Sequence, residues 1–466
     1  MAGFYAGRGD TSGGAGRDAS GDPNAAGDAL AKQTVTLYPS LSIHVGCLGG
    51  KELVCKMHAG QQIKDLKDKL ANQLGLDSGQ HRIDLACEDQ FIADDSAEIQ
   101  DLMSLSLSIT LRKLVCLESL EPEIPGDKPN KYDAGGVLSQ DGCIYFAPYN
   151  AGKVLRITAV GSVEMLEPEI PGNCKYSGGG VLAQDGCVYF APCDADKVLR
   201  ITAAGSVELL EPEIRGDFKY AAAGVLAQDG RVYFAPFDAG KVLCITAAGS
   251  VELLEPEIRG DYAAGGALAQ DGCVYFAPSH AGKVLRITAA GIVELLEPEI
   301  PGIFKYAAAG VLAQDGRVYF APCNAGKVLR IGAAGSVEML EPEIPGNCKY
   351  TGSGVLAQDG CVYFAPDNAG KVLRITAAGS VEFLQPEIPG DFTKYKGGGV
   401  LAQDGCVYFA PYDAGKVLRI TAAGDVELLE PEIPGVCNHG ARGVLAQDGY
   451  IYFAPCNTGK VLRIDC

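Results

Sequence analysis

The chain has 466 residues, of which 47% are hydrophobic and 21% charged, and its formal net charge is −19. This composition indicates a globular protein, and the negative charge argues against nucleic-acid and anionic-membrane partners, which both reward clustered Lys and Arg. No apolar run approaches the ~18 residues of a membrane span. Residues 1–32 have no apolar segment of the kind found in signal peptides, so we expect a cytoplasmic protein whose 17 cysteines are reduced.

The first quarter of the chain divides into two regions. Residues 1–32 are rich in Gly, Ala and Asp and show no periodicity, which predicts a disordered tail. Residues 33–113 instead predict a small α+β domain. Its expected elements are strands at 42–48 and 51–57 joined by a Gly-Gly turn, a helix at 61–74, and strands at 83–86 and 105–111.

The order of these elements resembles that of ubiquitin-like β-grasp domains. The resemblance implies an interaction module with an apolar recognition patch. Leu48 would keep one member of that patch, whereas Asp84 and Thr110 stand where the other two members are apolar. The chain continues from Arg112 without a free Gly-Gly end, so conjugation to substrates is not expected.

Residues 114–466 repeat one pattern eight times. Its clearest anchor is Gln-Asp-Gly, which recurs every 42 to 45 residues. The aspartates of this motif are Asp141, Asp185, Asp229, Asp271, Asp315, Asp359, Asp404 and Asp448. A period in the low forties built from strand-like segments is typical of β-propellers.

Each repeat contains the four strands of one propeller blade. In the second repeat the strands are expected at 181–184, 187–192, 197–202 and 206–210, with a tight turn at Asp185-Gly186. Only seven repeats are followed by their own fourth strand, and the missing copy precedes the first repeat at 115–124. We therefore predict an all-β propeller of eight blades in which strand 114–124 completes the last blade, with an open solenoid as the alternative.

The run Asp-Gly-x-Val-Tyr-Phe-Ala-Pro, followed by Ala-Gly-Lys-Val-Leu-Arg-Ile-Thr, resembles the repeats of streptogramin-lyase-like and NHL-type propellers. The resemblance covers all of 114–466 and implies the propeller fold. It also implies an alternative function, a metal-assisted lyase or hydrolase acting on a small molecule at the central channel. Such an enzyme needs a His, Glu and metal cluster, which the spacing of the five histidines does not indicate.

Two stretches vary between repeats: the loop between the second and third strands, and the segment that leads into each first strand. Both emerge at the same end of a blade, so one rim of the propeller carries most of the variation. This pattern fits a binding face on a rigid scaffold, and it equally fits drift at exposed positions.

The same rim carries a repeated Lys-Tyr pair, which is a candidate binding set because Tyr is a common hot-spot residue. The alternative is that each Tyr is a structural wedge between blades. The candidate residues are Lys131, Tyr132, Lys175, Tyr176, Lys219, Tyr220, Tyr262, Lys305, Tyr306, Lys349, Tyr350, Lys394, Tyr395 and His439. An Arg recurs in the third strand of seven repeats and a Glu recurs in the fourth, which predicts cross-strand ion pairs.

The sequence shows no catalytic set, no metal-ligand spacing and no cofactor motif. We therefore predict a monomeric, non-catalytic scaffold or adaptor. It would bind a protein partner through the variable rim of the propeller and use the ubiquitin-like domain as a second interaction module.

Overall fold

The computed structural model describes residues 41–46, 52–57, 63–74, 81–87, 90–91, 107–113, 115–126, 128–390 and 393–466. The predicted tail at 1–32 and the predicted patch residue Leu48 lie outside the described residues. The chain divides into two compact units, Met1–Leu76 with Ile83–Leu111, and Asp77–Arg82 with Arg112–Cys466.

The N-terminal unit contains the predicted hairpin, helix and later strands. Its elements are β1 (Leu41–Gly46), β2 (Glu52–Met57), α1 (Ile63–Leu74), β3 (His81–Cys87), β4 (Gln90–Phe91) and β5 (Leu107–Lys113). The described strands form an antiparallel β1-β2 pair and a separate sheet of order β4-β3-β5, so the β-grasp arrangement stays a prediction. No helix in the described ranges is long and apolar enough to cross a bilayer.

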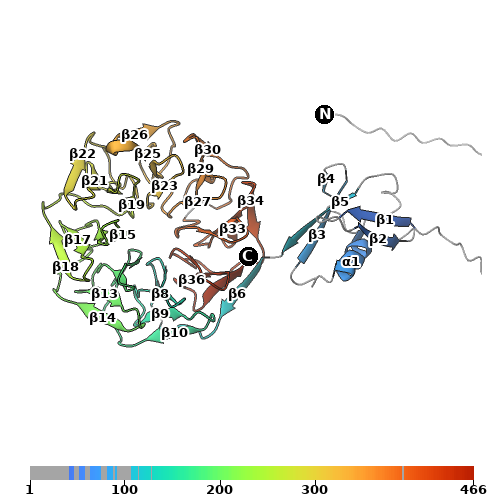
Figure 1. Ribbon diagram of the computed structural model, residues 1–466, viewed down its shortest axis with the longest axis horizontal. Helices are drawn as coiled ribbons and strands as arrows, with labels where there is room; N and C mark the ends of the chain where they lie inside the picture. Colours follow the sequence, from blue (N-terminus) through green and yellow to red (C-terminus); the bar gives the residue numbers. More distant parts are fainter. Residues whose placement is uncertain are drawn as a thin grey trace, which may run out of the picture. The chain divides into compact units, whose positions relative to one another are not determined.

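The second unit is an eight-bladed all-β propeller, as predicted. Eight four-stranded antiparallel sheets stand around a ring (Figure 1). Blades 1 to 4 comprise β7 (Val137–Leu138), β8 (Ile144–Phe146), β9 (Val154–Ile157), β10 (Val163–Leu166); β11 (Val181–Leu182), β12 (Val188–Phe190), β13 (Val198–Ile201), β14 (Val207–Leu210); β15 (Val225–Leu226), β16 (Val232–Phe234), β17 (Val242–Ile245), β18 (Val251–Leu254); and β19 (Ala267–Leu268), β20 (Val274–Phe276), β21 (Val284–Ile287), β22 (Val293–Leu296).

Blades 5 to 8 comprise β23 (Val311–Leu312), β24 (Val318–Phe320), β25 (Val328–Ile331), β26 (Val337–Leu340); β27 (Val355–Leu356), β28 (Val362–Phe364), β29 (Leu373–Ile375), β30 (Val381–Phe383); β31 (Val400–Leu401), β32 (Val407–Phe409), β33 (Val417–Ile420), β34 (Val426–Leu429); and β35 (Val444–Leu445), β36 (Tyr450–Phe453), β37 (Val461–Asp465) with β6 (Cys116–Leu120). A 3-10 turn, η2 (Ala333–Gly335), precedes β26.

The repeated Asp-Gly turn fixes the first hairpin of each blade. In blade 2, Gly186 has a left-handed φ of +77°, which glycine adopts without strain. The Asp185 carboxylate accepts the Cys187 N–H at 2.9 Å and the Tyr189 hydroxyl at 2.6 Å. One aspartate thus ties the turn to the second strand, which explains why this residue recurs at every blade.

The hydrophobic core lies between neighbouring blades rather than within them. Val188 and Phe190 of blade 2, for example, pack in one buried cluster with Tyr145 and Val154 of blade 1. An equivalent cluster contains residues of blades 1 and 8. The first strands of successive blades contact one another around the channel, including β35 with β7, so they are the innermost strands.

The fourth strand of blade 8 is β6, which pairs antiparallel with β37 and places Leu117 opposite Ile464. The predicted Arg–Glu pairs face each other across the third and fourth strands. In blade 2, Arg200 Nε donates to Glu208 at 2.8 Å, and β6 contributes Glu118 to the corresponding pair with Arg463. These pairs are confirmed as cross-strand contacts.

Candidate functional site

The structure places the seven tyrosines of the predicted rim set in the interior, where each exposes at most 1% of its surface. Tyr176 is typical: it packs between blades 1 and 2, and its hydroxyl donates to the Lys197 carbonyl at 3.0 Å. The same bond to a main-chain carbonyl is made by Tyr132, Tyr220, Tyr262, Tyr306, Tyr350 and Tyr395. Such burial is what the alternative interpretation requires, in which each Tyr is a structural wedge between blades.

The paired lysines are buried as well, each exposing 7% or less. Lys175 Nζ donates to the Gly172 carbonyl at 2.9 Å, and burial lowers the pKa of Lys175 to about 8. The others are Lys131, Lys219, Lys305, Lys349 and Lys394. In blade 8 the pair is replaced by Asn438 and His439, both buried. These side chains lie beneath the face of the propeller, so a partner at the surface does not reach them directly.

We call the segment between the outer strand of one blade and the inner strand of the next the leading loop. A side chain from the preceding blade anchors it. Asp194, in the loop between β12 and β13, accepts the N–H of Phe218 at 2.7 Å, and Phe218 has a left-handed φ of +47°. Asn or Asp makes the equivalent bond at Asn150, Asn324, Asn368, Asp413 and Asn457. In six of the eight blades the second residue of the variable loop therefore has a structural role.

Bulky apolar side chains stand exposed on three leading loops, and that of blade 8 carries Val436, which is 65% exposed. Phe218 is 49% exposed, Phe304 is 50% exposed at a φ of +48°, and Ile303 is 63% exposed. The ring of Phe304 makes an edge contact with His280 at a centroid distance of 4.1 Å. We call Ile303, Phe304 and His280 the Phe304 patch.

His280 has a carboxylate partner of its own. Its Nδ1 lies 2.7 Å from Oδ1 of Asp261, which occupies the position of the repeated Lys in blade 4. The spacing of the Asp-Gly motifs is 42 residues here, against 44 or 45 elsewhere, so the blade-4 leading loop is two residues shorter than most. This imidazole–carboxylate pair is a consequence of that irregular repeat.

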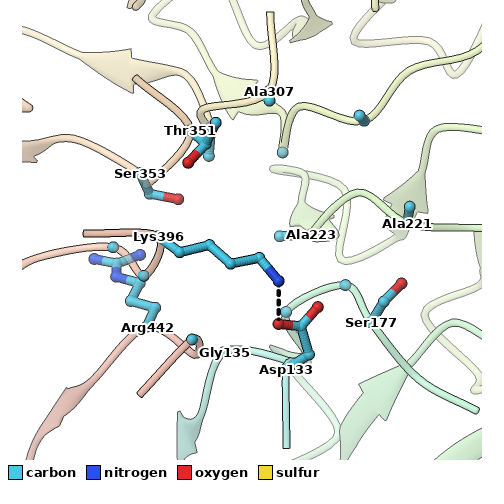
Figure 2. Close-up of a pocket in the computed structure, with 18 of the residues that line it drawn as sticks. Asp133, Gly135, Ser177, Ala221, Ala223, Ala307, Thr351, Ser353, Lys396 and Arg442 are labelled. Atoms are coloured by element: carbon cyan, nitrogen blue, oxygen red, sulfur yellow. Dashed lines mark hydrogen bonds and ion pairs between the residues drawn. The ribbon is translucent and has the colours of Figure 1, made fainter. Parts of the chain in front are cut away.

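A cavity of about 470 Å³ occupies the mouth of the central channel (Figure 2). Its lining residues follow each rim Tyr, or His439 in blade 8, by one to four positions. The residues one position after are Asp133, Ser177, Ala221, Ala263, Ala307, Thr351, Lys396 and Gly440. Blades 3 to 5 thus present alanines, whereas the polar side chains come from the other part of the ring.

Lys396 and Asp133 form an ion pair across this mouth, with Nζ 2.6 Å from Oδ1. Lys396 belongs to blade 7 and Asp133 to blade 1, so the pair spans blade 8, which presents Gly440 at the same position. A Cβ at Gly440 would lie 3.1 Å from Oδ1 of Asp133, so a larger residue there would crowd this contact. Burial alone would lower the pKa of Lys396, but the Asp133 carboxylate outweighs it and raises the pKa.

Arg442 is the second cation of the channel. The corresponding residues of the other blades are Gly135, Gly179, Ala223, Gly265, Ala309, Ser353 and Gly398. Within the described part of the chain, the Arg442 side chain has no hydrogen bond or ion pair, and surrounding protein lowers its pKa by desolvation. The aliphatic part of the Arg442 side chain packs over Gly398, because a Cβ built at Gly398 would lie 2.9 Å from Cγ of Arg442.

The channel residues were not among the candidates drawn from the sequence. Their signal was present in the variable segment before each first strand, at the positions just after the repeated Tyr. The buried Lys-Tyr pair lies next to them and is more conspicuous because it recurs.

Across the described ranges, no group of three or more His, Cys, Asp or Glu residues could hold a metal ion. The two described histidines of the propeller lie away from the channel cavity: His280 faces Asp261, and His439 is buried.

Comparison with known proteins relates the propeller to lyases. The model of the Virginiamycin B lyase family matches residues 127–339. No curated protein matches the chain. Selenomethionine-substituted virginiamycin B lyase from Staphylococcus aureus is similar in structure with a TM-score of 0.51 and 18% identity, over 76% of this chain and 99% of that chain.

A catalytically inactive histidine-to-alanine variant of the same enzyme, with quinupristin, gives a TM-score of 0.50 and 18% identity over the same shares of the two chains. The propeller is virginiamycin B lyase-like. At this identity the similarity concerns the fold.

Proposed function

We propose that the chain is a non-catalytic scaffold or adaptor that binds a protein partner through the face carrying the leading loops, with the Phe304 patch at the centre of the contact. The observation that carries this proposal is the exposure of Phe304 and Ile303 on a rigid frame. Large apolar side chains are usually buried, and aromatic residues are enriched in protein interfaces.

The backbone of Phe304 supports the same conclusion. A left-handed conformation is strained for a bulky residue, and such strain often accompanies function. Blade 1 places Asn130 at the equivalent position with a φ of +56°, a residue that tolerates this conformation well. The fold therefore does not require an aromatic side chain here.

This comparison provides the test. Ile303→Asn with Phe304→Asn reproduces the residues found at these positions in blades 2 and 1, so the variant should fold like the wild type. We expect it to capture at least about tenfold less of a specific partner in affinity purification followed by quantitative mass spectrometry.

The matched control is Leu295→Ser, because Leu295 is 45% exposed on the outer strand β22, away from the leading loops. Its set of captured proteins should match that of the wild type. Equal capture by the double variant and the wild type would remove the Phe304 patch from the interface.

The other parts of the proposal depend on the same frame. The fourteen buried Lys, Tyr and His residues would act indirectly, by holding the leading loops in place. We propose that β6 acts as a clasp, that is, that it closes the ring of blades by pairing with β37. We also propose that the N-terminal unit has the ubiquitin-like β-grasp fold and acts as a second interaction module. We further propose that the protein is a cytoplasmic monomer.

A second candidate function is a lyase acting on a small molecule, favoured by the family match and by the His280–Asp261 pair. A carboxylate on Nδ1 orients an imidazole so that Nε2 can act as a base. Incubation with quinupristin, followed by liquid chromatography and mass spectrometry, tests it. Turnover that falls at least about 100-fold in His280→Ala would establish the activity, and no turnover by the wild type would exclude it for this substrate.

A further inference from the structure

The central channel contains a second binding site, separate from the Phe304 patch. Two cavities follow each other along it and share Arg442 and the glycines Gly136, Gly180, Gly310 and Gly354 in their walls. The first is the polar mouth of about 470 Å³, and the second has a volume of about 590 Å³. Arg442 therefore stands where the two cavities meet.

The side chains of the second cavity are apolar except for Arg442, although polar main-chain atoms also form part of its wall. Apart from Arg442 and glycines, its described lining consists of valines and leucines of the innermost strands. Leucines such as Leu138, Leu312 and Leu356 are half-buried, so each keeps part of its side chain open to the channel. An aliphatic chain that displaces water from these side chains gains roughly 0.8 kcal/mol for each buried CH₂ group.

The charge at the junction is positive. Asp133 is the one carboxylate among the described residues of the mouth, and it is already paired with Lys396. Arg442 has no such partner among the residues that the structure describes, although the protein as a whole carries a charge of −19. The Arg442 side chain is exposed to the channel, so a carboxylate can bind its guanidinium in a bidentate manner without first breaking an ion pair.

Ser353 lies beside the guanidinium stem. A Cβ at Gly398 would lie 2.9 Å both from Cβ of Ser353 and from Cγ of Arg442, so these two side chains flank Gly398 from either side. Figure 2 shows Ser353, of blade 6, and Arg442, of blade 8, at the same edge of the cavity. The hydroxyl adds a neutral donor next to the cation.

We propose that the channel binds a linear aliphatic carboxylate, with its head group on Arg442 and Ser353 and its hydrocarbon tail among the leucines of the innermost strands. The polar mouth admits the head group, and the apolar cavity beyond Arg442 selects the tail. A free inorganic anion lacks the tail, and an alcohol or amine of the same length lacks the negative charge.

The test uses the full-length chain and decanoate below its micellar concentration, with binding followed by isothermal titration calorimetry. We expect saturable binding of decanoate, and binding at least about tenfold weaker for decanol, decylammonium and butyrate. Arg442→Ser places the blade-6 residue on blade 8, so it should fold, and it should weaken decanoate binding at least about tenfold.

Three results would overturn the proposal: no binding of decanoate to the wild type, equal binding to Arg442→Ser, or butyrate binding as tightly as decanoate. The double variant Ile303→Asn, Phe304→Asn should bind decanoate like the wild type, and Arg442→Ser should still capture the protein partner. The two proposals therefore succeed or fail separately.

Discussion

A protein that begins at residue 125 is expected to lose about 5 kcal/mol of unfolding free energy and to aggregate. A protein that begins at residue 114 should remain a stable propeller. The shorter chain lacks β6, and with it the partly buried Leu117 and Leu120 and the buried Ile124. Each aliphatic side chain contributes roughly 1.5–3 kcal/mol when fully buried, and β37 would be left as an unpaired edge.

Urea denaturation and light scattering of the two truncated proteins measure this difference. A synthetic peptide of residues 115–126 added in trans should restore part of the stability to the shorter protein, because it carries the pairing residues of β6 and Glu118 for Arg463. If both truncated proteins unfold at the same urea concentration, β6 does not act as a clasp.

The second large effect is expected at acid pH and comes from His439. This residue exposes 2% of its surface, and its ring nitrogen Nδ1 lies 3.2 Å from the Ala454 carbonyl oxygen. Burial lowers the pKa of His439 from 6.5 to about 4. The folded protein therefore holds the neutral ring, while the unfolded chain takes up a proton below pH 6.5.

The unfolding free energy that His439 contributes is fully present above pH 6.5, and it is lost as the pH falls towards 4. The loss corresponds to about 3 kcal/mol, since each pKa unit is worth about 1.4 kcal/mol. The matched variant is His439→Tyr, which restores the residue found at this position in the other seven blades.

Denaturation curves of both proteins at neutral pH and at pH 4 provide the measurement. The fall in unfolding free energy between the two conditions should be smaller in His439→Tyr by about 3 kcal/mol. An identical fall in the two proteins would mean that His439 is not the group responsible.

The sequence predicted the propeller because each local signal agreed with the others. The Asp185-Gly186 turn, the strand-forming run that follows it and the repeat of about 44 residues all point to four-stranded blades, and the structure has them. The predicted strands are a few residues longer than the observed ones, such as 181–184 against Val181–Leu182, because alternation of side chains extends beyond the paired backbone.

The site was harder to predict, because recurrence does not distinguish a buried residue from an exposed one. Tyr176 and Lys175 satisfy their polar atoms on main-chain carbonyls inside the propeller, which no local pattern reveals. Arg442 and Lys396 stand at positions where other blades have small residues, and only the closed geometry of neighbouring first strands brings them to one channel.

The pairing of β6 with β37 also determines how the number of blades can change. The boundary of the repeat in the chain does not coincide with the boundary of a blade in space. Loss or duplication of an internal 44-residue unit by unequal recombination would therefore leave both halves of the shared blade intact. The number of blades can therefore change by whole repeats, while the pairing of β6 with β37, which joins the two ends of the propeller, stays the same.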